Sequence, residues 1–266
     1  MKPARFVMDR PRDLAAALAM IVEADGTTKI MAGGQSLGPM LNLRLVEPDR
    51  IIDISGVPEL RRIEKTNDAL VVGACVTHAD IEDGRVPDVA NGMMARVASG
   101  IAYRAVRNRG TIGGSLAHAD PAADWVSALS ALSAEVEGAS RERKVRRVKL
   151  GEFVLGALDV GLAADELVTA IRVPALPPSA RWGYVKHCRK VGEFAHAIGA
   201  VVIDPAEGSG RAVIGAVEAA PIVIEDVRIL FSGAINDGLD SLGYALPCAL
   251  RGRSSATDAT AQADCT

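Results

Sequence analysis

The sequence predicts an α+β fold in two parts. Segments with helical periodicity and segments with strand character alternate up to about residue 176. Pro174, Pro177 and Pro178 follow, and proline cannot donate a hydrogen bond to a sheet. Strand patterns then restart at Gly183, which predicts a boundary near residues 176–180 and two parts that span 1–176 and 177–266.

The opening of the chain is predicted to hold one helix and two strands. Asp13 is a good N-cap for a helix over Asp13–Glu23, in which Leu14, Leu18 and Ile21 recur at helical spacing. The next predicted elements are a turn at Gly26, a strand at Lys29–Ala32, a glycine-rich turn with a helical or looped segment through Leu45, a strand at Ile51–Ile54 and a connector from Pro58.

The middle of the chain is predicted to mix helices with four further strands. Thr77 is placed to cap a short helix over Ala79–Asp83. The other predicted elements are a strand at Leu70–Gly73, a helix at Ala90–Ser99, a second glycine-rich stretch at Arg107–Ser115, a helix at Ala122–Ala134, a hairpin over Glu135–Val148 and a strand at Leu167–Val173.

The second part is predicted to begin as a sheet and to end in helix. The strand patterns cover Gly183–Cys188, Ile198–Ile203 and Arg211–Gly215, and a helix or two should follow. Residues 251–266 are rich in Ser, Thr, Ala and Asp, so we expect a frayed tail there.

Composition excludes several classes of function. A net charge of −3 and an aromatic content of 3% argue against a nucleic-acid-binding surface. No apolar run is long enough to span a membrane, and the N-terminus lacks the features of a signal peptide, so we expect a cytoplasmic protein. None of the four cysteines forms a C-x-x-C pair, so an iron–sulfur cluster or zinc site on this chain is not expected.

Two glycine-rich stretches are the candidate binding elements. The first is Ala32-Gly33-Gly34-Gln35-Ser36-Leu37 and the second is Gly110-Thr111-Ile112-Gly113-Gly114-Ser115. Glycine lets the backbone approach a ligand closely, and successive N–H groups with nearby hydroxyls can cradle a phosphate. The two stretches together could clamp one diphosphate through neutral donors. Neither matches the P-loop or the Rossmann pattern.

The same residues allow two other interpretations. Gly34-Gln35-Ser36-Leu37-Gly38 has the form of the nucleophile elbow of serine hydrolases, with Asp124 and His196 as possible triad partners. His118, Asp120 and Asp124 could instead bind a divalent metal ion, although Asp120 is also suited to cap the following helix.

Together the two stretches resemble the medium, FAD-binding subunit of the molybdenum hydroxylases, the family of carbon monoxide dehydrogenase, xanthine dehydrogenase and N-heteroaromatic hydroxylases. The long run from Arg107 to Asp124 carries most of the resemblance. Further matching positions are Leu43-Arg44, Asp53-Ile54, Pro58-Glu59-Leu60, Gly73-Ala74 with Thr77, Asp165-Glu166-Leu167-Val168, Val173-Pro174 and Tyr184-Val185-Lys186.

The resemblance implies a vanillyl-alcohol-oxidase-like (PCMH-type) fold. Its FAD-binding domain would span 1–176, with subdomains of about 1–57 and 58–176, and a C-terminal domain would span 177–266. Both glycine stretches would wrap the FAD diphosphate, and Asp124 would contact the adenosine side. The backbone at Leu167 would meet the flavin ring, Lys186 would lie near that ring or its access, and Phe194 would supply a nearby aromatic side chain. Lys190 and Glu193 depart from the Arg pair and Asp that are common in the family.

The resemblance also implies the partners and the chemistry. A large subunit would carry the molybdenum cofactor and a small subunit two 2Fe–2S clusters, in a dimer of heterotrimers. Electrons would pass through FAD on this chain to an external acceptor, and no catalytic base is expected here. The substrate pocket would lie on another chain, so carbon monoxide, purines, aldehydes and N-heteroaromatics all remain open. A flavin-free scaffold subunit is a further alternative.

Overall fold

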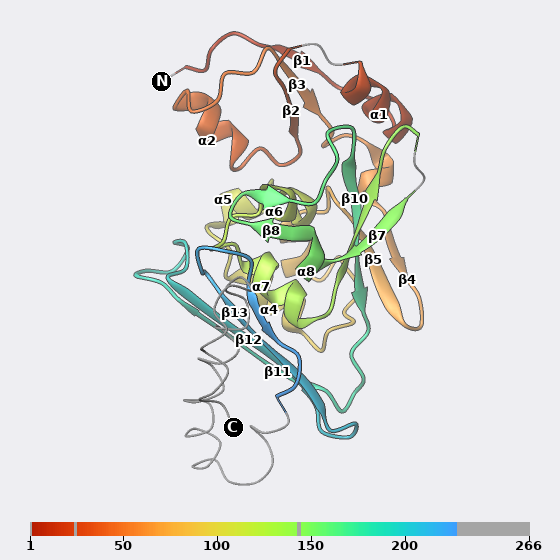
Figure 1. Cartoon of the computed structure of the whole chain (residues 1–266), viewed down its shortest axis with the longest axis vertical. Coiled ribbons are helices and arrows are strands. Elements are labelled where there is room, and N and C mark those ends of the chain that lie inside the picture. The colour runs from red at the N-terminus through yellow and green to blue at the C-terminus, as the bar shows by residue number, and fades with distance from the viewer. Residues whose placement is uncertain (1, 24–25, 143–144, 228–266) are drawn as a thin grey trace, which may run out of the picture.

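Three sheets that follow one another in the chain surround a central group of helices in the computed structural model (Figure 1). The structure describes residues 2–23, 26–142 and 145–227. The first sheet lies at the top of Figure 1, the second at the right and the third below the helices. The predicted α+β class is confirmed.

The first sheet is small and parallel. It has the order β1-β3-β2, with strands β1 (Val7–Asp9), β2 (Thr28–Met31) and β3 (Arg50–Asp53). Helix α1 (Leu14–Val22) begins where predicted, because the Asp13 carboxylate accepts the N–H of Ala16 at 2.7 Å. Helix α2 (Leu37–Asn42) follows the first glycine stretch.

The second sheet is antiparallel and supplies much of the core. Its order is β4-β5-β10-β6-β7, with β4 (Ile63–Lys65), β5 (Ala69–Gly73), β6 (Glu135–Ala139), β7 (Arg146–Lys149) and β10 (Leu167–Pro174). Every residue of β5 is buried, since this inner strand is covered on both faces. A 3-10 turn at Pro58–Arg61 forms the predicted connector into this sheet.

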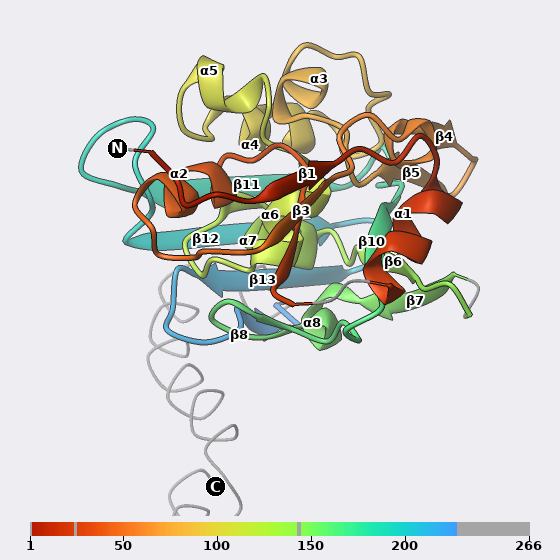
Figure 2. The same cartoon turned by 90° about the horizontal axis from the view of Figure 1, so that it is seen from above.

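Short helices fill the space between the second and third sheets. They are α3 (His78–Glu82), α4 (Met93–Ser99), α5 (Arg104–Arg107), α6 (Ile112–His118), α7 (Asp124–Ala131) and α8 (Leu150–Phe153). Every residue of α7 is buried, because α7 packs against β12 and β13 of the third sheet and against the helices α4, α6 and α8. Figure 2 shows the first sheet crossing over α6 and α7 when the molecule is seen from above.

The third sheet is an antiparallel meander, β11-β12-β13-β14. Its strands are β11 (Arg181–His187), β12 (Ala197–Asp204), β13 (Ser209–Gly215) and β14 (Ile222–Ile224), and a separate small hairpin joins β8 (Val154–Gly156) to β9 (Asp159–Val160). Its inner face packs on α7 through Ala200 and Val213, which are buried in the same apolar cluster as Trp125 and Leu129.

Several elements differ from the sequence-based expectation. Helix α7 begins at Asp124 and not at Ala122, because Asp120 closes a turn onto the N–H groups of Ala122 and Ala123 and does not cap a helix. Helix α4 begins at Met93, after Gly92 in a left-handed conformation. Strands β4, β8, β9 and β14 and helix α8 are too short for a periodic signal and were not predicted. The predicted closing helices and the frayed tail lie outside the described residues.

Candidate functional site

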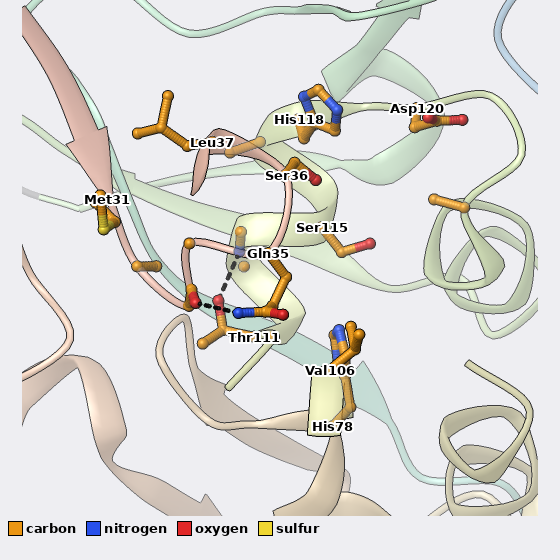
Figure 3. A pocket seen from close by; sticks show the side chains of 18 of the residues that line it. Met31, Gln35, Ser36, Leu37, His78, Val106, Thr111, Ser115, His118 and Asp120 are labelled. Carbon is orange, nitrogen blue, oxygen red and sulfur yellow. Dashed lines mark hydrogen bonds between the residues drawn. The ribbon is translucent and has the colours of Figure 1, made fainter. Parts of the chain in front are cut away.

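One cavity of about 460 Å³ collects the predicted cofactor residues (Figure 3). This volume falls within the range of about 300–1,000 Å³ that is usual for small-molecule sites. Ile112 alone among the predicted residues does not line the cavity, because its side chain is fully buried in the core. The others do: Ala32, Gly33, Gly34, Gln35, Ser36, Leu37, Gly110, Thr111, Gly113, Gly114, Ser115, Asp124, Leu167, Lys186 and Phe194.

The first glycine stretch presents free backbone donors. It leaves strand β2 and turns at Gly34, whose φ of +69° is a left-handed conformation that glycine adopts without strain. Within the described chain, the N–H groups of residues 33–36 find no acceptor. Gln35 braces the turn, since its side-chain amide donates to the carbonyl of Gly33 at 3.1 Å. This arrangement is the predicted cradle for an anion.

The second glycine stretch is the start of helix α6 and not a second turn of the same kind. Its N–H groups are already used: Ile112 donates to Val76 O, Gly113 to Ala74 O, and Gly114 to the hydroxyl oxygen of Thr111 at 3.1 Å. Of the cavity-lining residues in this stretch, Thr111 and Ser115 carry hydroxyl groups. The expectation of paired nests is therefore corrected, because contacts with residues 74–76 draw this segment into a helix.

The two glycine stretches touch each other. A Cβ added to Gly33 would overlap the carbonyl of Arg109 and would lie 2.8 Å from the Cα of Gly110. In Figure 3 the Gln35 and Thr111 side chains lie next to each other at this junction. Residues more than 70 positions apart thus form one continuous wall of the cavity. Gly33 is required because any larger residue would keep the two stretches apart.

Gly113 serves packing against the strand layer, and its substitution gives a testable result. A Cβ there would lie 2.7 Å from the Cα of Ala74, whereas a Cβ on Gly38 meets nothing within 4 Å. We expect Gly113→Ala to lower the free energy of unfolding by about 2 kcal/mol, with Gly38→Ala as the matched near-neutral control. Urea denaturation measures both. Equal stability of the two variants would contradict the packing role of Gly113.

Asp124, Tyr184 and Lys186 form a buried polar cluster at the cavity. The Asp124 carboxylate accepts the Tyr184 hydroxyl at 2.8 Å and the Lys186 ammonium at 2.9 Å, and the Asp124 and Lys186 side chains are 6% and 11% exposed. Burial and the nearby Asp124 carboxylate raise the pKa of Tyr184, so its hydroxyl remains a donor. Because Asp124 and Lys186 are in contact, they form one polar group in the cavity wall, whereas the resemblance implied a separate role for each of them.

Leu167 and Phe194 lie at different depths of the cavity. Leu167 is 5% exposed at the start of β10, while Phe194 is 68% exposed in the loop between β11 and β12. Glu193, which also lines the cavity, is held by Arg189 and Lys190 in this loop. Lys190 itself does not line the cavity. The loop brings Phe194 to the wall of the cavity without burying it.

His78 is a cavity residue that the sequence analysis missed. Its side chain is buried, with 5% exposure, and its Nδ1 accepts the indole N–H of Trp125 at 3.0 Å. Its backbone N–H donates to the carbonyl of Gly110. Only the capping signal at Thr77 marked this segment, and that signal says nothing about the side chain that follows.

Burial of His78 predicts a loss of stability with acid. Burial, with a smaller effect from Arg107, lowers the pKa of His78 from 6.5 to about 4. The unfolded chain therefore binds a proton first as the pH falls below 6.5, and stability decreases until the folded imidazole also titrates near pH 4. The difference corresponds to about 3 kcal/mol. Urea denaturation across this range should show the loss in the wild type, and His78→Gln should lack that component.

The two alternative interpretations gain no support from the geometry. Both oxygens of Asp124 are occupied by Tyr184 and Lys186, so Asp124 does not orient a histidine for a serine nucleophile. Ser36 precedes α2 and does not cap it through its side chain. Among the described residues, no group of three or more His, Cys, Asp or Glu side chains is placed to hold a metal ion. No helix in the described ranges is long and apolar enough to cross a membrane.

Known proteins match both the chain and its fold. Residues 4–176 match the family described as the FAD binding domain in molybdopterin dehydrogenase. Caffeine dehydrogenase subunit beta from a Pseudomonas species is 36% identical over 203 residues, which cover 76% of this chain and 69% of that protein. The carbon monoxide dehydrogenase medium chain of Hydrogenophaga pseudoflava is 36% identical over 205 residues, 76% of this chain and 70% of that one.

A solved structure extends the match through the third sheet. Quinoline 2-oxidoreductase from Pseudomonas putida 86 superposes with a TM-score of 0.82 at 32% identity, over 96% of this chain and 90% of the matched chain. The serine-hydrolase and flavin-free scaffold alternatives find no support among these relatives.

Proposed function

Since the chain belongs to the family of FAD-binding domains of molybdopterin dehydrogenases, we propose that it is the FAD-carrying medium subunit of a heteromeric molybdenum hydroxylase. Bound FAD would supply the electron transfer between the 2Fe–2S clusters of a small partner subunit and an external acceptor. We place the molybdenum cofactor and the substrate pocket on a large partner subunit. The relatives' names, subunit beta and medium chain, support a complex of several chains.

The observation that carries this proposal is the wall formed where the two glycine stretches meet. The N–H groups of residues 33–36 lack acceptors in the described chain, and no Cβ can enter between Gly33 and Gly110. Such a surface fits a diphosphate, because it offers several neutral donors and close approach of the backbone. The chemistry of the donor set therefore fits FAD.

The residues of this chain would bind and orient FAD and would carry none of its redox chemistry. The backbone at Gly33–Ser36 would hold the diphosphate, with the Ser36, Thr111 and Ser115 hydroxyls nearby. Leu167 and Phe194 would border the flavin ring. The cluster of Asp124 and Lys186 would form the polar wall between these regions. No residue in the cavity has to act as a general base.

The assembly and the division of the chain belong to the same proposal. We infer a dimer of heterotrimers in the cytoplasm, each with one large, one medium and one small subunit. We also propose that residues 1–57 and 58–176 are two subdomains that hold FAD, and that 177–266 form a further domain. The described sheets support this division, since each stretch contains a sheet of its own.

The function can be tested on the purified complex. After denaturation, we expect one FAD to be released per medium subunit, together with the loss of the visible absorbance of oxidised flavin. Mass spectrometry of the copurified chains should identify a large molybdenum-cofactor subunit and a small iron–sulfur subunit. A complex that is fully assembled and contains no flavin would contradict the proposal.

A further inference from the structure

The buried imidazole of His78 is a second kind of hydrogen-bond donor in the cavity, besides the backbone N–H groups. The role inferred for it rests on the proposed function, because it concerns the binding of FAD. His78 is the first residue of α3 and lines the cavity. Figure 3 labels it among the cavity side chains, below Ser115 in that view. Its ring is nearly inaccessible to bulk solvent.

Trp125 determines which nitrogen of His78 carries the proton. An indole N–H is only a donor, and it ends 3.0 Å from Nδ1 of His78. Nδ1 must therefore accept, which places the single proton of the neutral ring on Nε2. Trp125 is fully buried, so this hydrogen bond is held from inside the core.

The Nε2–H group has no acceptor among the described residues. The only hydrogen bond of the His78 ring in that part of the chain is the one to Trp125. Nε2 is not among the fully buried polar atoms that lack a partner in that part of the chain, which are the hydroxyl oxygens of Thr28 and Ser127, so Nε2 keeps access to the cavity. Because the ring lines the cavity, a bound ligand can supply the missing acceptor.

The position of Nε2 points to one part of the cofactor. A Cβ on Gly110 would lie 2.8 Å from Nε2, so the ring rests against that glycine. The Gly110 Cα in turn lies against Gly33, where the free N–H groups of the first stretch begin. The imidazole thus stands beside the junction of the two stretches, which is where the diphosphate would bind.

We propose that His78 donates a hydrogen bond from Nε2 to a diphosphate oxygen of bound FAD, in a tautomer that Trp125 fixes. The ring then binds an anion without carrying a charge itself. Burial lowers the pKa of His78 to about 4, which is consistent with a neutral donor at physiological pH. His78 completes the set of neutral donors begun by the glycine backbone and the hydroxyls.

The test compares FAD affinity in the intact complex after the flavin has been stripped. His78→Leu removes the donor, and we expect FAD to bind roughly 10- to 100-fold more weakly. His78→Gln keeps an N–H donor near the same place and should retain most of the affinity. ADP, which carries the diphosphate, should lose affinity in parallel with FAD, whereas riboflavin, which lacks it, should not.

A second variant tests the tautomer of His78 while its side chain stays in place. Trp125→Phe removes the donor to Nδ1 and lets His78 adopt the other tautomer, whose Nε2 cannot donate. We expect weaker FAD binding from Trp125→Phe, although Trp125 does not line the cavity. This variant and His78→Gln decide the question if His78→Leu does not assemble.

The outcomes distinguish this inference from the proposed function. A wild-type complex that binds no FAD overturns the proposed function itself. A wild type that binds FAD, with His78→Leu and Trp125→Phe binding it equally well, overturns the role of His78 alone. An equal loss of affinity for riboflavin and ADP in His78→Leu would also overturn it, because the effect would then be general and not confined to the diphosphate.

Discussion

Gly33→Ala should abolish tight FAD binding and destabilise the protein. The added Cβ would overlap the carbonyl of Arg109, so the two glycine stretches would have to separate. Overpacking of this kind costs about 1–3 kcal/mol. The displaced N–H groups would no longer converge, so we expect at least a tenfold loss of FAD affinity. Fluorescence titration with FAD and urea denaturation measure the two effects.

A matched glycine provides the control. Gly38 lies five residues after Gly33, in α2, and a Cβ there meets nothing within 4 Å. Gly38→Ala should keep FAD affinity and stability close to the wild type. If Gly33→Ala also kept the FAD affinity and stability of the wild type, the close contact between the two glycine stretches would be contradicted.

Asp124→Ala should be the most destabilising substitution in the cavity. It would leave the Lys186 ammonium, 11% exposed, and the hydroxyl of Tyr184 without their shared acceptor. Removal of one partner of a buried ion pair typically costs about 3–5 kcal/mol. Urea denaturation should show a loss of this size, and FAD should bind more weakly because the polar wall of the cavity is disturbed.

The double variant Asp124→Ala with Lys186→Met tests whether the unpaired charge of Lys186 causes the loss of stability. Since it removes the unpaired charge, it should recover part of the stability lost in Asp124→Ala. Asp159→Ala, at an exposed carboxylate in β9, should change little. A double variant as unstable as the sum of the two single substitutions would show that the charge of Lys186 is not the source of the loss.

Local signals predicted much of the fold. The Asp13 and Thr77 caps form as expected, and Thr77 with Asp80 makes a reciprocal capping box. The hairpin of β6 and β7 and the meander of β11, β12 and β13 also match their patterns. These features depend on neighbours within a few residues or on a strand period, and a single sequence shows both.

The features that were missed depend on distant partners. Gly113 and Gly114 suggest a turn by themselves, and it is the carbonyls of Ala74 and Val76 that draw them into α6. The ion pair of Asp124 and Lys186 joins positions 62 residues apart. His78 acquires its importance from Trp125, 47 residues away. Tertiary contacts decide all three, and neither composition nor spacing reports them.

A crystal structure of the protein with FAD tests the central claim most directly. We expect the diphosphate to lie between Gly33–Ser36 and the start of α6, within hydrogen-bonding distance of the N–H groups of the first stretch. Density for FAD elsewhere on the chain, with this cavity filled only by solvent, would contradict it.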